Sequence, residues 1–230
     1  MLHYTDIAII GGGCYGSFYL GQLLKARSAG ALDWQRVLVV DRDAACQAAG
    51  AIATVDGVEL VVAEWGAFLD DWLDRDLRTD HDQLVPSPLM PHLMAEWLTR
   101  RAAEHWPAHR VGMVPASAPA GTPFDALHPG DGVRYMSHAD WVCPVHSIEP
   151  ATSPMIKAPR GREMSDHPTA GPALFVCRHV SHGVGMYPIT GAFAALDALD
   201  AVVRREGRGD LVIGSVSACH GAAAVLRVER

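Results

Sequence analysis

Short apolar runs alternate with helical patterns over the first 75 residues. Runs dominated by isoleucine, valine and alanine occupy residues 5–11, 36–41 and 58–63, and each predicts a buried strand. Between the first two runs, apolar residues recur every three or four positions, which predicts a helix over residues 14–29. A second helical stripe follows the third run, at Phe68, Leu69, Trp72 and Leu73. Strands that alternate with helices are typical of an α/β protein with a parallel sheet.

The pattern changes after residue 84. Residues 84–91 contain three prolines, and proline removes a backbone donor and restrains the residue before it, so no regular element is expected there. A helix is predicted from Pro91 to about His105, and a short strand at residues 111–115. Residues 115–172 hold 10 of the 15 prolines, so we expect a proline-rich insertion of low regular structure over residues 115–171. A connection of this length is expected to be a functional cover or a small lobe.

Regular patterns return near residue 173. Residues 173–177 predict a buried strand, and a glycine-rich turn at 182–185 precedes a helix whose apolar residues run from Ile189 to Val203. Residues 210–216 predict a further strand, with 222–228 pairing to it as an edge strand. We expect this strand–helix–strand segment to complete the sheet that the first residues begin.

The first strand leads directly into Gly11-Gly-Gly-Cys-Tyr-Gly16, which fits the spacing G-x-G-x-x-G. Gly11 provides the tight turn off the strand, Gly13 lets the backbone approach a pyrophosphate, and Gly16 lets the helix pack closely on the strand. The helix N-terminus offers unpaired N–H groups and the positive end of its dipole to phosphates. The second strand ends on Asp41, whose carboxylate is placed to accept the two hydroxyls of an adenine ribose.

These residues resemble the Rossmann NAD(P)/FAD-binding superfamily over residues 5–41. The resemblance implies a Rossmann-like parallel sheet with helices on both faces. It divides the chain into a dinucleotide-binding half (1–114), the insertion (115–171) and a C-terminal segment that completes the sheet (172–230). S-adenosylmethionine sites share a glycine-rich turn and an acid, so methyl transfer is an alternative.

The resemblance implies NAD or NADP as the cofactor, with FAD as a further candidate. An acid at the end of the second strand repels a 2′-phosphate and favours NAD, whereas Arg42 beside it is able to bind that phosphate, so the choice stays open. Glu64 follows the third strand, where loops that contact the cofactor usually lie. The candidate cofactor-binding residues are Gly11, Gly12, Gly13, Cys14, Tyr15, Gly16, Asp41, Arg42 and Glu64.

Composition and charge argue against nucleic acid and membranes as binding partners. The chain has 230 residues, 49% of them hydrophobic and 20% charged, which is ordinary for a globular protein, and its net charge is −7. An acidic chain without a basic run is a poor binder of nucleic acid or of an anionic membrane. No apolar stretch reaches about 18 residues, and no basic and apolar leader precedes the first strand. Five cysteines, an odd number, suggest reduced thiols in the cytoplasm.

Histidines lie close to three of the five cysteines: Cys143 with His146, Cys177 with His179, and Cys219 with His220. Thiolate and imidazole are zinc ligands, but no C-x-x-C pair is present and twelve histidines make such proximity common by chance. We therefore predict no metal site. His179, His182 and His220 follow or precede predicted strands, so they are the candidate catalytic acid/base residues.

Residues 143–154 resemble a ferredoxin cysteine run, C-P-x-x-C followed by another C-P, with serines at two ligand positions. Because a [4Fe–4S] cluster requires four thiolates, this resemblance implies a lost or never-present cluster. A metal- or Fe–S-associated redox protein that has lost its cluster is therefore a further alternative for the function.

Two functional hypotheses from different classes follow. The first is an NAD(P)-dependent oxidoreductase of a small-molecule substrate, with a histidine that exchanges the substrate proton and an insertion that covers the site. The second is a non-catalytic nucleotide-binding module, similar to the regulatory domains of potassium transporters, which share the Val-Asp-Arg-Asp run seen here at Val40 to Asp43 and work as oligomers. Homo-oligomerisation is left open.

Overall fold

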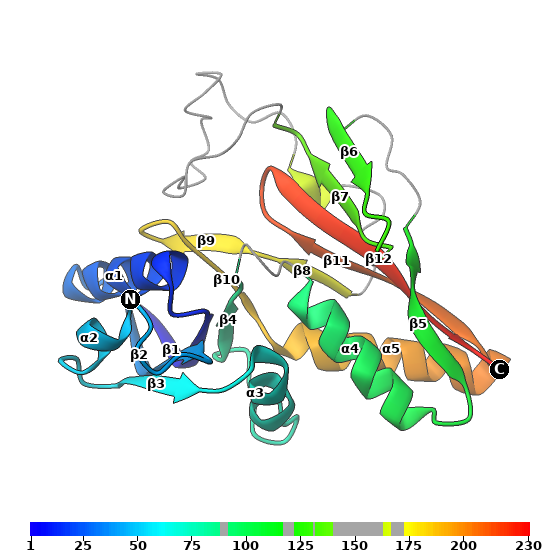
Figure 1. The fold of residues 1–230 in the computed structure, drawn as a ribbon, viewed down its shortest axis with the longest axis horizontal. Helices are drawn as coiled ribbons and strands as arrows, with labels where there is room; N and C mark the ends of the chain where they lie inside the picture. The colour runs from blue at the N-terminus through cyan, green and yellow to red at the C-terminus, as the bar shows by residue number, and fades with distance from the viewer. Residues whose placement is uncertain (88–91, 117–121, 131, 140–162, 167–172) are drawn as a thin grey trace. The chain divides into compact units, whose positions relative to one another are not determined.

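The structure, a computed structural model, describes residues 1–87, 92–116, 122–130, 132–139, 163–166 and 173–230 (Figure 1). Within these residues the chain is a mixed α/β protein with two mixed sheets and five α-helices. It divides into two compact units. The first contains residues 1–87 and 178–190, and the second contains the described residues from 92 to 177 together with 191–230. The chain therefore passes between the units several times.

The first unit is built on a six-stranded sheet in the order β3-β2-β1-β4-β10-β9. Strands β1 to β4 are parallel, and β10 joins β4 in the antiparallel direction. The strands are β1 (Leu2–Ile10), β2 (Leu32–Asp41), β3 (Val58–Val62), β4 (Gln83–Val85), β9 (Arg178–Ser181) and β10 (Val184–Pro188). The helices are α1 (Cys14–Ser28), α2 (Ala49–Ile52) and α3 (Trp65–Trp72).

The core of the first unit explains why α1 forms where it does. Leu20 and Leu23 of α1 are fully buried against Ile7 and Ile9 of β1, because residues two apart on a strand share one face. Two parallel crossovers in opposite directions place α1 and α3 on opposite faces of the sheet, as Figure 1 shows. The apolar runs of β1 and β2 are continuous rather than alternating because both of their faces are covered.

The second unit is built on a sheet in the order β6-β7-β12-β11-β8, with β5 also paired to β12. Its long strand β12 pairs along one edge with β11 and along the other with β7 and then β5. The strands are β5 (Arg110–Pro115), β6 (Phe124–Leu127), β7 (Arg134–Ser137), β8 (Ala173–Val176), β11 (Gly209–Val216) and β12 (His220–Glu229). The helices are α4 (Leu93–His105), α5 (Thr190–Glu206) and the short 3-10 helix η1 (Met164–Asp166).

Helices α4 and α5 pack together through an edge-to-face contact between Trp97 and Phe193, whose ring centroids are 6.2 Å apart. The start of β11 lies close against α5. A Cβ atom added to Gly209 would lie 3.0 Å from Val203 and 3.1 Å from Leu199. The small residue at position 209 therefore sets the distance between helix and sheet.

The expected fold class is confirmed only in its coarser form. The protein is α/β and four strands of the first sheet are parallel, but both sheets also contain antiparallel pairs. Residues 172–230 do not complete the first sheet as a unit. Only β9 and β10 join it, while β8, β11 and β12 build the second sheet. Apolar periodicity predicts strands without identifying their partners, which is why the sequence does not distinguish these arrangements.

The region expected to be an insertion of low regular structure contains two paired strands, β6 and β7, and the helix η1. The ferredoxin-like run at residues 143–154 lies outside the described residues, as do Cys143 and His146. No helix in the described part of the chain is long and apolar enough to cross a membrane.

Candidate functional site

The glycine-rich turn joins β1 to α1 at the carboxyl end of the parallel strands. The N–H of Gly11 donates to the carbonyl of Val40 at 2.8 Å, so the turn starts in register with the end of β2. Gly11 has a φ of +92°, a left-handed conformation that residues with a Cβ atom rarely adopt. The tight turn that the sequence assigns to Gly11 is therefore present.

Gly16 packs directly against the backbone of the same turn. A Cβ atom added to Gly16 would lie 1.8 Å from the carbonyl oxygen of Gly11, far inside van der Waals contact. A Cβ atom added to Gly13, by contrast, would meet no atom within 4 Å. The turn is thus closed on its protein side at Gly16 and open on its outer side at Gly13, the face that a pyrophosphate would approach.

Asp41, at the end of β2, is bonded to the turn. Its Oδ2 accepts the N–H of Gly12 at 2.7 Å, and its Oδ1 accepts the N–H of Asp43 at 2.9 Å. One carboxylate therefore links the glycine turn to the segment that follows β2. Each of its oxygens keeps a further lone pair with which to accept a hydroxyl.

Two side chains pack on the turn from outside the G-x-G-x-x-G motif. Cys46 is buried, and its Sγ lies 2.4 Å from the position that a Cβ of Gly12 would take. The N–H of Ala48 donates to the Gly12 carbonyl at 2.9 Å and holds this segment in place. Trp65, the first residue of α3, places Cζ2 of its indole 3.5 Å from the corresponding position of Gly11.

The N-terminus of α1 faces outward without a cap. The first intrahelical bond runs from the N–H of Ser17 to the carbonyl of Gly13, so the amides of Cys14, Tyr15 and Gly16 have no acceptor within the helix. Gly13 makes no side-chain cap and the first turn contains no acidic residue. Within the first turn of α1, therefore, neither a side-chain cap nor a carboxylate competes with an anion for the positive end of the helix dipole.

The other predicted cofactor residues differ in position. Cys14 is exposed and Tyr15 is half-buried, both in the first turn of α1. Arg42 is exposed directly beside Asp41. Glu64 is exposed at the N-cap position of α3, and its carbonyl rather than its carboxylate accepts the N–H of Phe68 at 2.9 Å.

The three candidate catalytic histidines do not lie in one unit. His179 lies on β9 and His182 in the turn between β9 and β10, both in the first unit, whereas His220 begins β12 in the second. The side chain of Gln22 on α1 donates to the carbonyl of His182 at 2.7 Å, so this turn packs along α1. His179 and His220 are half-buried and His182 is exposed. His179 and His182 therefore belong to one unit and His220 to the other.

Metal-ligating side chains do not gather in the described part of the chain, where no group of three or more His, Cys, Asp and Glu residues could hold an ion. Cys177 and Cys219 are half-buried thiols in the second unit. The N–H of Cys177 donates to the carbonyl of Val216 at 2.7 Å, and the carbonyl of Cys219 accepts the N–H of His138 at 2.8 Å. Their described backbone contacts thus join β8 and β7 to the ends of β11 and β12.

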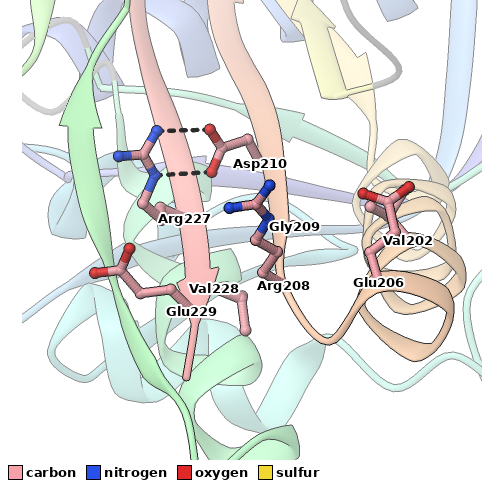
Figure 2. Close-up of a pocket in the computed structure, with 8 residues that line it drawn as sticks. All are labelled: Val202, Glu206, Arg208, Gly209, Asp210, Arg227, Val228 and Glu229. Carbon is pink, nitrogen blue, oxygen red and sulfur yellow. Dashed lines mark hydrogen bonds and ion pairs between the residues drawn. The ribbon is translucent and has the colours of Figure 1, made fainter.

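The second unit contains a pocket of about 520 Å³ where the end of α5 meets β11 and β12 (Figure 2). Arg227 holds Asp210 through two hydrogen bonds of 2.9 and 2.7 Å, and these bonds keep the pKa of Asp210 below its ordinary value. The lining residues are Val202, Glu206, Arg208, Gly209, Asp210, Arg227, Val228 and Glu229. Three acids and two arginines largely balance one another, so the pocket favours no ligand of a single charge.

The first unit is therefore an α/β unit with a glycine turn, an acid bonded to that turn and a helix without a side-chain cap. A family model, AF_1314_C, described as "Uncharacterized protein, C-terminal domain", matches residues 94–229, more than half of the chain. The chain therefore belongs to this family. No curated protein and no solved structure matches the chain. The matched range begins after the glycine turn and Asp41.

Proposed function

We propose that the first unit binds an adenine dinucleotide in the manner of a Rossmann fold, and that the protein uses it as an oxidoreductase. The observation that carries the binding proposal is the close approach of Gly16 to the Gly11 carbonyl beside a turn that is open at Gly13. Such a turn requires glycine at both ends while leaving its outer face clear. This division of roles is the one that a pyrophosphate-binding turn needs.

Strand order supports the same proposal. The chain builds β1, β2 and β3 in one direction across the sheet and then returns to place β4 on the other side of β1. The strand order therefore reverses at β1, and ligands of open parallel sheets bind beyond the carboxyl ends of the strands at such a reversal. The glycine turn stands at this point, since it leaves the carboxyl end of β1.

The ligand's parts follow from the positions of the protein groups. The pyrophosphate would lie on the amides of Cys14, Tyr15 and Gly16 at the start of α1. The adenine ribose would lie at the end of β2, where Asp41 has lone pairs to accept its hydroxyls. A 2′-phosphate there would meet a carboxylate, so NAD or FAD is favoured over NADP unless Arg42 turns toward the phosphate.

The redox part of the proposal follows from what such cofactors do. NAD(P) and FAD exchange a hydride with a substrate, and the protein supplies binding, orientation and a proton donor or acceptor. His179 and His182 lie in the same unit as the turn and are the candidates for that proton exchange. His220, at the start of β12 in the second unit, stays a candidate for the same exchange, and His220→Ala is assayed beside the other two variants.

A turnover assay tests the redox part. The purified chain is incubated with NADH, NADPH or FAD and a panel of carbonyl and hydroxyl substrates while cofactor absorbance is followed. We expect His179→Ala or His182→Ala to abolish turnover while cofactor affinity persists. Turnover that survives in both variants would remove these histidines from the mechanism. Tight cofactor binding with a change of assembly and no turnover on any substrate would instead support the non-catalytic module.

A further inference from the structure

Trp65 lies next to the glycine turn although it comes from a different part of the sheet. It begins α3, three residues past the end of β3, and Cζ2 of its indole lies 3.5 Å from the position that a Cβ of Gly11 would take. Because β2 lies between β3 and β1, these two strands are about 10 Å apart, twice the usual spacing. The indole therefore reaches across the carboxyl end of β2, the strand end that bears Asp41.

We propose that Trp65 forms the aromatic wall of the adenosine pocket and packs against the adenine base. This inference rests on the proposed function, because it takes the ribose position from Asp41. A base attached to a ribose at Asp41 lies beyond the end of β2, on the side of β3. Trp65 brings an aromatic surface to this end of the sheet, beside the first glycine of the turn.

Exposure distinguishes Trp65 from the other described tryptophans. Trp65 is half-buried, whereas Trp34, Trp72, Trp97 and Trp106 are all at most 9% exposed. A buried tryptophan is a core residue with no surface left for a ligand. Trp65 has an edge on the turn and further surface open to solvent, which is the arrangement that a base needs in order to stack.

The aromatic side chain of Trp65 determines which part of the ligand is recognised. Aromatic side chains stack on any base through its π-face, so the indole recognises the adenine end that NAD, NADP and FAD share. Selection among these cofactors must then come from their other ends and from Asp41 and Arg42. ADP-ribose, which contains the shared half alone, is the appropriate probe.

The experiment measures ADP-ribose binding by calorimetry and by tryptophan fluorescence in the full chain. Wild type is compared with Trp65→Phe, Trp65→Ala and the control Trp34→Phe, which removes a buried indole at the other end of β2. We expect Trp65→Ala to weaken binding roughly 5- to 150-fold, the range for loss of one base stack, and Trp65→Phe to weaken it less. The fluorescence change on binding should persist in Trp34→Phe and vanish in Trp65→Phe.

The outcomes separate this inference from the function on which it rests. Equal affinity of wild type and Trp65→Ala for ADP-ribose, or a fluorescence change retained in Trp65→Phe, would overturn the role of Trp65 and leave the dinucleotide site standing. If wild type binds neither ADP-ribose nor any of NAD, NADP and FAD, both the proposed function and the proposed role of Trp65 are wrong. Should Trp65→Ala not fold, Trp65→Phe and the wild-type fluorescence still decide the question.

Discussion

The carboxylate of Asp41 accepts the backbone N–H of Gly12 at 2.7 Å, so the acid at the end of β2 is bonded to the turn at the end of β1. Its other oxygen accepts the N–H of Asp43. Asp41 thus has two roles in our account: it fixes the turn in the ligand-free protein, and it offers its remaining lone pairs to a ribose.

Replacing Asp41 should therefore lower stability as well as binding. In Asp41→Ala both backbone donors lose their acceptor. The partly buried bond to the charged group from Gly12 contributes about 1.5–3 kcal/mol, whereas water replaces the exposed bond from Asp43. We expect the free energy of unfolding in urea to fall by about 2 kcal/mol, and ADP-ribose binding to be lost. The control is Asp210→Ala, which removes an exposed pair with Arg227 and should change stability by less than about 1 kcal/mol. Equal losses in the two variants would contradict a special role for Asp41.

Three glycines of the α1 region give a graded test. Gly16→Ala should prevent the turn from forming, since the new Cβ would overlap the Gly11 carbonyl. Gly13→Ala should leave the melting temperature nearly unchanged but weaken nucleotide binding, because it fills only the open outer face. Gly21→Ala, in the helix interior with no atom within 4 Å of the new Cβ, should stabilise the protein by about 0.5–1 kcal/mol. A Gly16→Ala variant as stable as Gly21→Ala would contradict the close packing of Gly16 against the Gly11 carbonyl.

A buried charge network lies before the glycine turn, on β1. Asp6 is 3% exposed and accepts hydrogen bonds from Arg36, Arg78 and Trp72, while its own N–H donates to the equally buried Asp82. Burial raises the pKa of Asp6, but the hydrogen bonds from Arg36, Trp72 and Arg78 outweigh it and leave the pKa below its ordinary value. The ionised form of Asp6 is therefore the one that the fold stabilises.

This network predicts the pH dependence of stability. Removing one partner of a buried ion pair is destabilising by about 3–5 kcal/mol, so Asp6→Asn should lower the unfolding free energy by about that amount at pH 7. Because the folded pKa of Asp6 is depressed, its contribution is complete above about pH 4 and is lost as the pH falls through the folded pKa. Urea unfolding from pH 7 to pH 3 should show the difference in unfolding free energy between the two proteins starting to shrink below about pH 4. A constant difference across that range would show that the effect is not the charge of Asp6.

The turn between β9 and β10 makes a separate prediction. His182 and Gly183 have φ values of +50° and +78°, and Ser181 pairs with Val184, as in a two-residue type I′ hairpin. Gly183→Ala should destabilise by about 1–2 kcal/mol, since a Cβ disfavours this conformation. His182→Asn should leave stability unchanged or slightly raised, because asparagine tolerates positive φ. If His182 exchanges a proton, the same His182→Asn variant should lose turnover, which separates chemistry from folding.

The sequence predicts the first unit well because its signals are local. The apolar runs that end at Ile10 and Asp41, and the glycine spacing between them, place β1, α1 and β2 within a few residues of their observed bounds. Strand β4 (Gln83–Val85) was not expected, because three residues beside a proline-rich segment leave no periodic pattern.

The strand pairing of the second sheet could not be predicted from the sequence, for a different reason. Residues 222–228 were expected to form an edge strand, but β12 is paired on both of its edges. Pairing depends on contacts between distant segments, such as Arg110 with Glu229, that no local pattern encodes. The contacts of Cys46 and Trp65 with the turn are tertiary in the same sense, and no spacing in the sequence marks Cys46.

The central claim is that the turn between β1 and α1 holds an adenine dinucleotide, and thermal melting tests it most directly. The purified chain is melted alone and with NAD, NADH, NADP, NADPH, FAD and S-adenosylmethionine, beside the Gly13→Ala variant. A ligand at 100 times its dissociation constant stabilises by about 2.7 kcal/mol, a shift of roughly 5–10 °C for a chain of this size. We predict that shift with a dinucleotide in wild type and its loss in Gly13→Ala. No shift with any dinucleotide, or an equal shift in the variant, would contradict the claim.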